Sequence, residues 1–381
     1  MSRKIFTEDH EIFRTAFRKY LEKEVVPHLD EWEAQAEVPR SAWRKMGEQG
    51  YLCPWLEEKY GGSGADFRYS VIINEEMSRV RAMGFSVSLH NDIVVPYLEA
   101  YGTEDQKNQW LPGCTTGEMV TAVAMTEPGA GSDLQAIRTR AVKAGDDYLL
   151  NGQKTFITNG HCCDLVIVAC KTDTTAKPAH KGISLICVEA GRPGFVKGRK
   201  LKKMGLGFQD TAELFFEDCR VPRSNLLGEE GRGFVYLMEK LQQERLIVVL
   251  RSQVAAEIML EQTIAYCRSR EAFGRPISRF QHNSFKIVEM ATEIELGRTF
   301  VDDLLADHLE GKDIVKKVSM AKWWIAEMAN RVAYQCVQLH GGYGYMDEYE
   351  ISRWYRDIRA ATIYAGTTEI MKGVIAKMMD L

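Results

Sequence analysis

The chain has 381 residues, of which 45% are hydrophobic and 27% are charged, a composition typical of a soluble globular protein. A chain of this length predicts about two to three domains, or one large bundle with an insertion. The formal net charge of -4 gives no electrostatic reason to expect a nucleic-acid partner. No stretch approaches the roughly 18 apolar residues of a membrane-spanning helix, so we expect no membrane span.

The nine cysteines are scattered and include no Cys-x-x-Cys pair, which argues against a zinc site and against a disulfide scaffold. We therefore expect no metal centre, and reduced thiols as in an intracellular protein. The N-terminal segment MSRKIFTEDHEIF has no apolar stretch of the kind found in a secretory signal. These features predict a cytoplasmic protein or, if the chain is a mature processed form, a protein of the mitochondrial matrix.

Residues 1–118 form the first predicted domain, and from residue 7 onward most of it has a helical pattern. Thr7, followed by Glu8 and Asp9, is typical of an N-cap with an acidic first turn. Residues 99–112 contain a helix end, a glycine stop and a second capped helix start. The N-terminal domain is therefore predicted to be α-helical.

Residues 119–232 form the second predicted domain and are rich in β-forming residues. Asn151-Gly152 lies between two apolar runs in DYLLNGQKTFI, which is the strongest short-range signal for a β-hairpin. Further strands are predicted at residues 165–172, 182–190 and 211–222. No helical pattern separates these strands, so a small antiparallel barrel or sandwich is favoured over a parallel βαβ sheet.

Residues 233–381 form the third predicted domain, which is again helical. One long helix is predicted from residue 233 onward, because the run FVYLMEKLQQERLIVVLRSQVAAEIMLEQTIAYCRSR contains neither proline nor glycine. Two more helices are predicted at 281–311 and 313–340, and such long helices pack as a bundle. The predicted fold class is therefore α+β and mainly α, with a helical domain, a small antiparallel β domain and a C-terminal helical bundle.

The segment AMTEPGAGSDL at 124–134 is the first candidate ligand-binding site. Gly129 and Gly131 let a ligand approach the backbone closely, and Thr126 and Ser132 supply hydroxyl groups. The segment matches neither a Walker loop nor a dinucleotide fingerprint, because no Gly-Lys-Ser/Thr and no helical pattern follow it. By itself it is better explained as a tight turn without a ligand.

Three more segments carry groups that suit a ligand. In KTFITNG at 154–160, Thr158 offers a hydroxyl and Phe156 a flat apolar ring. The run RSREAFGRPISRFQ combines Phe273 with arginines, whose fixed fork of donors suits pyrophosphate. Glycine-rich turns in QLHGGYGYM and IYAGTTEIM flank a helix near the end of the chain. Taken singly, an ordinary strand, a solvated basic loop and helix-ending turns explain these segments better.

The order and spacing of the four segments together resemble the acyl-CoA dehydrogenase family. The resemblance extends nearly end to end, and GRKLKKMGL, QDTAELFFED and QERL are most similar to the long-chain branch. It implies a helical domain, a β domain, a C-terminal four-helix bundle, one FAD per subunit, and usually a homotetramer or otherwise a dimer. The implied reaction is the α,β-dehydrogenation of an acyl-CoA thioester to a trans-2-enoyl-CoA, with electrons passed to an electron-transferring flavoprotein.

This reaction needs a base beside the carbon next to the thioester carbonyl, and a buried carboxylate of raised pKa suits it. Many relatives carry the base as the Glu of a Tyr-Glu-Gly turn, but here the turn is Tyr364, Ala365 and Gly366. In the long-chain and isovaleryl branches the base lies on a helix of the C-terminal bundle. The matching position in this chain is Glu244, which the resemblance therefore implies to be the catalytic base.

Helical spacing independently places Glu244 in a mostly apolar stripe with Leu237, Leu241, Val248 and Met259. An unpaired buried carboxyl group is costly, so it is usually paired, protonated or functional. The spacing alone leaves open that Glu244 forms a structural ion pair or lies at the wet end of the helix.

The resemblance also implies the remaining site residues. The FAD-binding positions are Met125, Thr126, Gly131, Ser132, Phe156, Thr158, Arg270, Phe273, Gln281, Gln338, Gly342, Thr367 and Glu369. Of these, Arg270, Phe273, Gln281, Gln338 and Gly342 are expected to reach the FAD of a neighbouring subunit. The substrate-binding positions are Ser132, Arg245, Tyr364, Ala365 and Gly366.

Three alternative functions remain open from the sequence. The first is a dehydrogenase for branched or cyclic acyl-CoA, which would use the same base in a different pocket. The second is an acyl-CoA oxidase on the same fold, with oxygen as the acceptor. The third is a non-catalytic flavin-binding relative that acts through a partner. The preference for acyl chain length is not determined by the sequence, although Tyr97 and Tyr101 could close the pocket floor.

Overall fold

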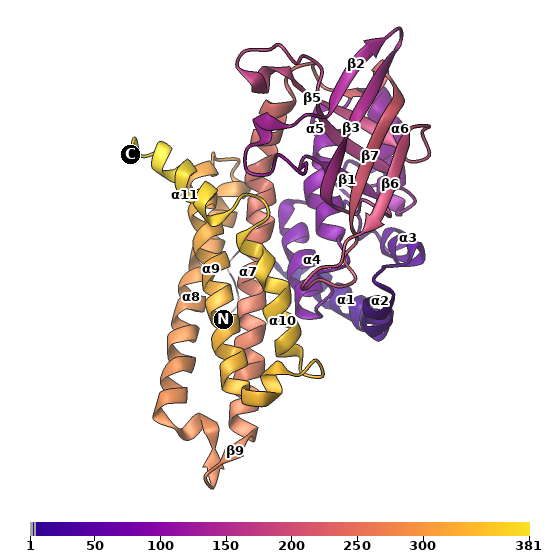
Figure 1. The fold of residues 1–381 in the computed structure, drawn as a ribbon. Coiled ribbons are helices and arrows are strands. Elements are labelled where there is room, and N and C mark those ends of the chain that lie inside the picture. The colour runs from indigo at the N-terminus through magenta and orange to yellow at the C-terminus, as the bar shows by residue number, and fades with distance from the viewer. Residues whose placement is uncertain (1–2, 4) are drawn as a thin grey trace.

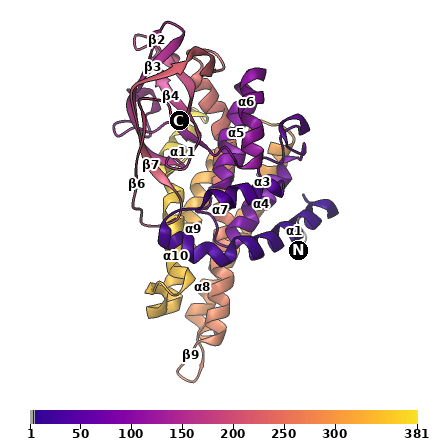
Figure 2. The same ribbon diagram turned by 90° about the vertical axis from the view of Figure 1, so that its right-hand side faces the viewer.

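The computed structural model describes residue 3 and residues 5–381. The C-terminal helices form a long bundle on one side of the molecule, and a β domain lies against its upper part (Figure 1). The N-terminal helices lie beside the bundle, and Figure 2 shows α5 (Val95–Tyr101) and α6 (Glu104–Thr116) rising next to the β domain. The order along the chain is helical, β and helical, which confirms the predicted fold class.

One helix of the N-terminal domain is largely buried. Before α5 and α6 the chain forms a π-helical turn, η3 (Leu89–Val94), and the helices α1 (Glu8–Glu24), α2 (Leu29–Gln35), α3 (Arg40–Glu48) and α4 (Phe67–Arg79). Residues 70–78 of α4 are all buried. The predicted capped start of α6 is confirmed, because the Gln106 N–H donates to Thr103 Oγ1 at 3.3 Å while the Gln106 side chain accepts from the Thr103 N–H.

The β domain is one eight-stranded sheet in the order β6-β7-β3-β2-β4-β5-β8, with β1 paired to β4. Its strands are β1 (Thr121–Ala124), β2 (Arg140–Ala144), β3 (Asp147–Thr158), β4 (Leu165–Lys171), β5 (Ile183–Glu189), β6 (Phe195–Lys200), β7 (Thr211–Pro222) and β8 (Leu226–Leu227). The predicted strands near 165, 182 and 211 are confirmed. The pairings are antiparallel except for the short parallel ladders that β4 forms with β1 and β2, so the sheet is mainly antiparallel as predicted.

The hairpin predicted at Asn151-Gly152 is wrong. β3 runs straight through this pair, and the turn lies instead between Ala144 and Asp147, where Gly145 has a φ of 65°. Asn151-Gly152 forms a β-bulge opposite β7, and the Asn151 side chain pairs with Asp218 at 3.0 Å. A β-bulge and a tight hairpin turn both favour residues with unusual backbone angles, so the same dipeptide suits either.

The bundle is built around two long helices that pack side by side, α7 (Gly233–Ser269) and α9 (Val315–His340). The predicted long helix from residue 233 is therefore confirmed, and α8 (Gln281–Leu309) follows a small hairpin of β9 (Glu271–Ala272) and β10 (Arg275–Pro276). The short helices α10 (Glu350–Ile358) and α11 (Thr368–Lys377) complete the bundle. Among the residues that the structure describes, no helix is long and apolar enough to cross a membrane.

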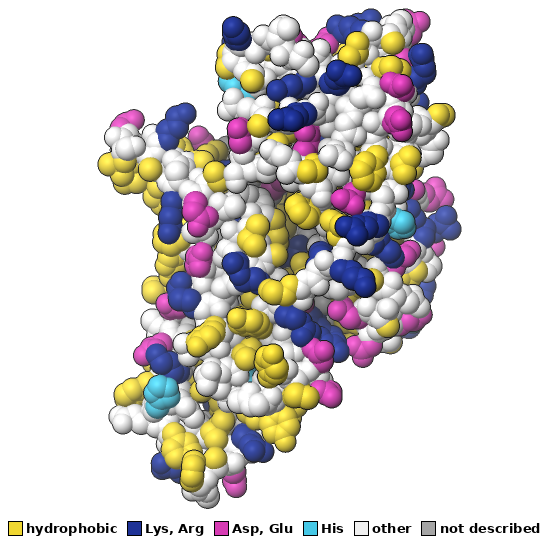
Figure 3. Space-filling model, in the orientation of Figure 1, with side chains coloured by type: hydrophobic (Ala, Val, Ile, Leu, Met, Phe, Trp, Pro, Cys, Tyr) yellow, Lys and Arg dark blue, Asp and Glu magenta, His cyan; other side chains and the backbone are white. Residues whose placement is uncertain are grey.

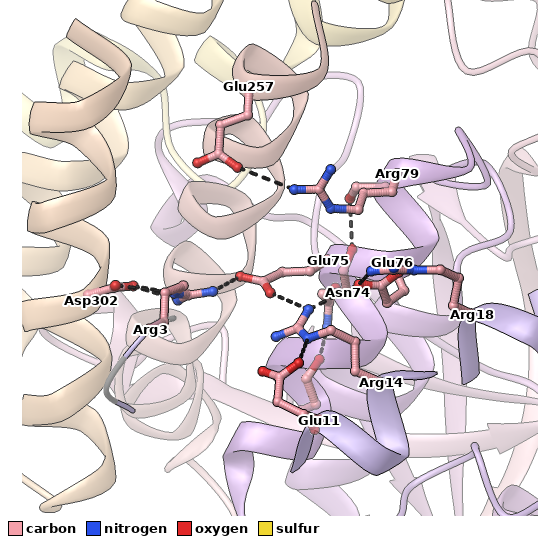
Figure 4. A network of polar contacts seen from close by, with 12 residues as sticks. Arg3, Glu11, Arg14, Arg18, Asn74, Glu75, Glu76, Arg79, Glu257 and Asp302 are labelled. Atoms are coloured by element: carbon pink, nitrogen blue, oxygen red, sulfur yellow. Dashed lines mark hydrogen bonds and ion pairs between the residues drawn. The ribbon is translucent and has the colours of Figure 1, made fainter. Parts of the chain in front are cut away.

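Two adjacent carboxylates of α4 lie at the centre of a cluster of ion pairs (Figure 4). Glu75 and Glu76 are both buried, and Arg14 of α1 donates to each of them, at 2.8 and 3.0 Å. Arg18 adds two more hydrogen bonds to Glu76. Because a buried charge is stable only when it is paired, these contacts hold α1 against α4.

The same cluster extends into the bundle. Arg298 of α8 donates to Glu75 at 3.2 Å and to Glu257 of α7 at 2.7 Å, and Arg3 joins Glu75 to Asp302. Burial by itself would raise the pKa of Glu75, but the guanidinium groups of Arg3, Arg298 and Arg14 hold that pKa below its ordinary value. Glu75 is therefore ionised in the folded protein.

Glu75→Gln is expected to lower the free energy of unfolding at pH 7 by about 3 kcal/mol, because it removes the buried carboxylate charge that three partly buried arginines share. The folded-state pKa is depressed, so this stabilisation is present above the ordinary pKa of 4.5 and is lost as the pH falls through the folded-state value. Urea unfolding of the wild type and the variant between pH 7 and pH 3 measures both effects. Glu11→Gln is the control, because Glu11 is an exposed partner of Arg14 and its loss should cost less than about 0.5 kcal/mol. An equal loss in both variants would contradict the special role of the buried pair.

Candidate active site

Glu244 lies on α7 with its side chain in the protein interior, where only 6% of the residue is exposed. The predicted apolar stripe is confirmed, because Leu237, Leu241, Val248 and Met259 are all buried. Tyr97 of α5 donates a hydrogen bond from its hydroxyl to Glu244 Oε1 at 2.8 Å. Burial raises the pKa of Glu244 to about 7, although the Tyr97 hydrogen bond and the charge of Arg245 act in the opposite direction.

This pKa gives Glu244 the chemical properties of a base. Near neutral pH such a carboxyl group is partly ionised, and it can accept a proton and hold it. Among the described residues no arginine or lysine forms an ion pair with Glu244, so the structural ion pair left open by the sequence is absent there. The neighbouring Arg245 is also buried, and its Nε has no hydrogen-bond partner among the described residues. An unpaired buried donor of this kind is suited to an acceptor group on a ligand.

The turn at residues 364–366 carries no carboxyl side chain, and alanine occupies its central position. Ala365 has a φ of 54°, which is uncommon for a residue other than glycine, and it packs against the core of the bundle. Lys322 of α9 is buried and donates a hydrogen bond from Nζ to the carbonyl oxygen of Gly366. Burial and the nearby charge of Arg245 lower the pKa of Lys322 to about 8. No described group accepts a hydrogen bond from the Ala365 N–H, so this donor is free for a ligand.

The loop at 125–132 is anchored to β3 by a buried ion pair. Lys154 donates to the Met125 carbonyl oxygen at 3.0 Å and to Glu127 Oε1 at 2.9 Å. Glu127 also accepts from the backbone N–H groups of Arg138 and Thr139. Burial by itself would raise the pKa of Glu127, but the Lys154 ammonium and these donors hold it below its ordinary value. The loop is thus tied at its start to the strand that carries Phe156 and Thr158.

The outer side of this loop is open. A Cβ atom added at Gly129 or Gly131 would meet no other atom within 4 Å, so packing within the chain does not require these glycines. The Thr126 carbonyl oxygen accepts a hydrogen bond from the Thr155 N–H at 3.0 Å, which brings the loop to the end of β3. There a second β-bulge turns Phe156 outward, and 66% of this residue is exposed. An uncovered ring beside an open glycine-rich loop is suited to a flat ligand.

The predicted site residues fall into separate groups within one chain. Met125, Thr126, Gly131, Ser132, Phe156 and Thr158 lie together around the loop and the end of β3. Glu244, Arg245, Tyr364, Ala365 and Gly366 belong to the bundle and its final turn. Figure 3 shows that this face of the molecule is hollowed where the bundle meets the β domain, and that hydrophobic side chains gather around the hollow.

The remaining predicted FAD residues lie elsewhere. Arg270, Phe273, Gln281, Gln338 and Gly342 lie around β9 and the end of α9, at the opposite end of the bundle from the β domain (Figure 1). Phe273 is 95% exposed. Thr367 caps α11 by accepting from the Ile370 N–H, and Glu369 lies in the first turn of that helix. Within a single chain, the five residues around β9 and the end of α9 therefore lie away from the loop at 125–132.

The sequence reasoning missed three charged residues of the site: Lys154, Glu127 and Lys322. A signal for Lys322 was present, because it lies at helical spacing from Val318, Ala321 and Ile325 on a face that is otherwise apolar. Lys154 gives no comparable signal, because it follows the polar stretch Asn151-Gly152-Gln153. A buried lysine needs a partner, so each of these positions indicates a specific contact.

Comparison with known families covers almost the whole chain. Models described as the N-terminal, middle and C-terminal domains of acyl-CoA dehydrogenase match residues 7–118, 122–219 and 231–379. The chain belongs to the acyl-CoA dehydrogenase family. It is 50% identical to the mitochondrial long-chain specific acyl-CoA dehydrogenase of Rattus norvegicus, over 99% of this chain and 88% of the relative.

Two further proteins are similar over nearly their full length. A solved structure of acyl-CoA dehydrogenase from Geobacillus kaustophilus is 62% identical, covers 100% of both chains and has a TM-score of 0.99. The caffeyl-CoA reductase-Etf complex subunit CarC of Acetobacterium woodii is 38% identical over 98% of this chain and 99% of its own.

Membership of the acyl-CoA dehydrogenase family makes this protein an FAD-dependent oxidoreductase that dehydrogenates an acyl-CoA. The residues present fit the cofactor, because the uncovered ring of Phe156 leaves room for the flat flavin ring and the open backbone at Gly129 and Gly131 allows close approach of the dinucleotide. They also fit the substrate, because the Ala365 N–H is a free donor for a carbonyl oxygen.

Lys154→Met is expected to weaken FAD retention about tenfold or more, because it leaves Glu127 as a buried, unpaired charge under the loop. The ratio of flavin to protein absorbance after dialysis measures this effect. Lys143→Met is the matched control, since Lys143 pairs with Glu230 on the surface of the same domain. Full flavin content in Lys154→Met would show that the ion pair does not hold the loop for the cofactor.

Proposed function

We propose that Glu244 is the catalytic base in the dehydrogenation of a saturated acyl-CoA to a trans-2-enoyl-CoA. The observation that carries this proposal is a buried carboxyl group of pKa about 7 in a chain whose final turn has Ala365 in place of a glutamate. Glu244 takes the proton from the carbon next to the thioester carbonyl. FAD, when bound, supplies the redox chemistry by accepting the hydride from the next carbon.

Ala365 has a second role in this proposal. Its backbone N–H donates to the thioester carbonyl oxygen, on which negative charge develops as the proton leaves, and one such donor lowers the barrier by about 3 to 4 kcal/mol. Lys322 supports the turn by donating to the Gly366 carbonyl oxygen. The base and the carbonyl donor thus come from different elements, α7 and the turn before α11.

We propose a straight acyl chain of medium to long length as the substrate. The 50% identity to the long-chain specific enzyme of Rattus norvegicus supports this choice. Tyr101 does not block the pocket floor in this proposal, because its hydroxyl donates to the exposed Glu239 and its ring stacks on Tyr236.

We also propose an electron-transferring flavoprotein as the acceptor, a homotetrameric assembly and a cytoplasmic location. The similarity to an Etf-complex subunit supports the acceptor, and 62% identity to a bacterial protein supports the location.

The exposed residues Phe285, Val288 and Leu296 of α8, together with Phe273, support assembly, since exposed apolar side chains of this size are usually covered by a partner. In such an assembly the distant FAD residues would serve a neighbouring subunit, and the mass in solution tests it.

Glu244→Gln is expected to bind acyl-CoA but to slow anaerobic bleaching of the flavin at least about a hundredfold, because the amide keeps the shape of the side chain and cannot accept the proton. The absorbance of the flavin after mixing with saturated acyl-CoA measures the rate. Glu239→Gln is the matched control, since Glu239 lies on the same helix with its side chain at the surface. Bleaching of Glu244→Gln at the wild-type rate would place the base at another residue.

The same assay with saturated acyl-CoAs from C4 to C18 tests the substrate class. We expect the bleaching rate constant to rise from C4 toward the longer chains. A flat profile would contradict the proposed chain length, and a preference for branched or cyclic acyl groups would replace it. Stoichiometric peroxide in air, with no transfer to an electron-transferring flavoprotein, would identify an oxidase.

A further inference from the structure

Tyr97 is a buried phenol whose hydroxyl contacts the side chain of Glu244. Its ring is fully buried in an apolar cluster that includes Val94, Leu98 and Leu237. The hydroxyl donates to Glu244 Oε1 at 2.8 Å, across 147 positions of sequence. Filling this cluster requires only the ring of Tyr97, so the hydroxyl group has a role beyond packing.

The segment that carries Tyr97 is held against α7 by a second contact. Gln243, next to Glu244 in the sequence, donates from Nε2 to the Asp92 carbonyl oxygen of η3 at 2.7 Å. The Asp92 carboxylate in turn accepts from Asn74 of α4 at 2.8 Å. Two consecutive side chains of α7 therefore bind the η3–α5 segment, which sets the position of the phenol relative to the carboxyl group.

We propose that Tyr97 is a positioning residue for proton transfer: its hydroxyl holds Oε1 of Glu244 and leaves Oε2 to receive the proton of the substrate. This inference rests on the proposed role of Glu244 as the base. Burial and the adjacent carboxylate raise the pKa of Tyr97 far above its ordinary value, so the phenol remains a donor at every pH of interest. It can donate to Oε1 both before and after Glu244 takes the proton.

The hydrogen bond also tunes the affinity of Glu244 for the proton. The charged and titratable groups around this carboxyl are Tyr97 from α5, Arg245 from α7 and, beyond Arg245, Lys322 from α9, while the Asp92 carboxyl of η3 is turned to Asn74. Burial favours the protonated form of Glu244, whereas Tyr97 and Arg245 favour the ionised form. Removing the phenol hydroxyl therefore raises the pKa of Glu244.

The test compares Tyr97→Phe with the wild type as FAD-loaded protein. The flavin bleaching rate constant is measured from pH 5.5 to pH 9.5 at low acyl-CoA concentration. Loss of the hydrogen bond should move the rising limb of this profile toward higher pH by about one unit, because the base then ionises at higher pH. Phenylalanine keeps the ring in the apolar cluster, so FAD content and the unfolding temperature should stay near wild type and verify that the variant is folded.

Tyr101→Phe is the matched control. Tyr101 lies one turn further along α5 and donates to the exposed Glu239 at 2.6 Å, so its loss should leave the profile unchanged. A merely structural effect of losing a tyrosine hydroxyl from α5 would lower the rates of both variants without shifting either limb.

Glu244→Gln, measured alongside, separates the two proposals. If Glu244→Gln is inactive and Tyr97→Phe shifts the rising limb toward higher pH, the role of Glu244 as the base and the role of Tyr97 are both supported. If Glu244→Gln is inactive and Tyr97→Phe follows the wild-type profile, the role of Tyr97 is overturned while Glu244 remains the base. If Glu244→Gln bleaches at the wild-type rate, the proposed base is wrong and the inference about Tyr97 is overturned with it.

Discussion

The burial of one carboxyl group on α7 determines how the candidate active site is organised. Water cannot solvate the charge of Glu244, and no buried cation pairs with it among the described residues, so its pKa rises to about 7. The rise is useful only if the group stays in a defined orientation. The rigid 37-residue helix provides that orientation from one side, and the Tyr97 hydroxyl provides it from the other.

Three other buried carboxylates are paired with cations instead. Glu75 and Glu76 each meet arginines, and Glu127 meets Lys154 together with two backbone donors. Their neighbours hold the pKa of Glu75 and of Glu127 below its ordinary value, and the ion pairs of all three carboxylates join parts of the chain that lie far apart in sequence. The difference lies in the neighbouring charges: cations hold a paired carboxylate in the ionised form at neutral pH, whereas burial without a paired cation lets Glu244 take up a proton.

The arrangement also explains how the final turn can lack an acidic side chain. If the base is on α7, as proposed, position 365 needs only its backbone N–H, and alanine supplies it. The cost of the left-handed backbone at Ala365 is offset by packing against the bundle and by the hydrogen bond from Lys322 to Gly366. The separation of base and carbonyl donor onto two elements ties the proposed chemistry to the packing of α7, α9 and the turn before α11.

The sequence by itself determined the helical, β and helical order, the long α7 and the apolar stripe around Glu244, because these follow from local periodicity and residue type. It also indicated the loop at 125–132, since closely spaced glycines and hydroxyl residues are typical of an open turn. Only the tertiary structure decided that Asn151-Gly152 forms a bulge, because the same backbone preference suits a hairpin turn. The contacts of Tyr97 with Glu244 and of Lys322 with Gly366 likewise join distant segments, and their partners are set by how helices pack rather than by any local pattern.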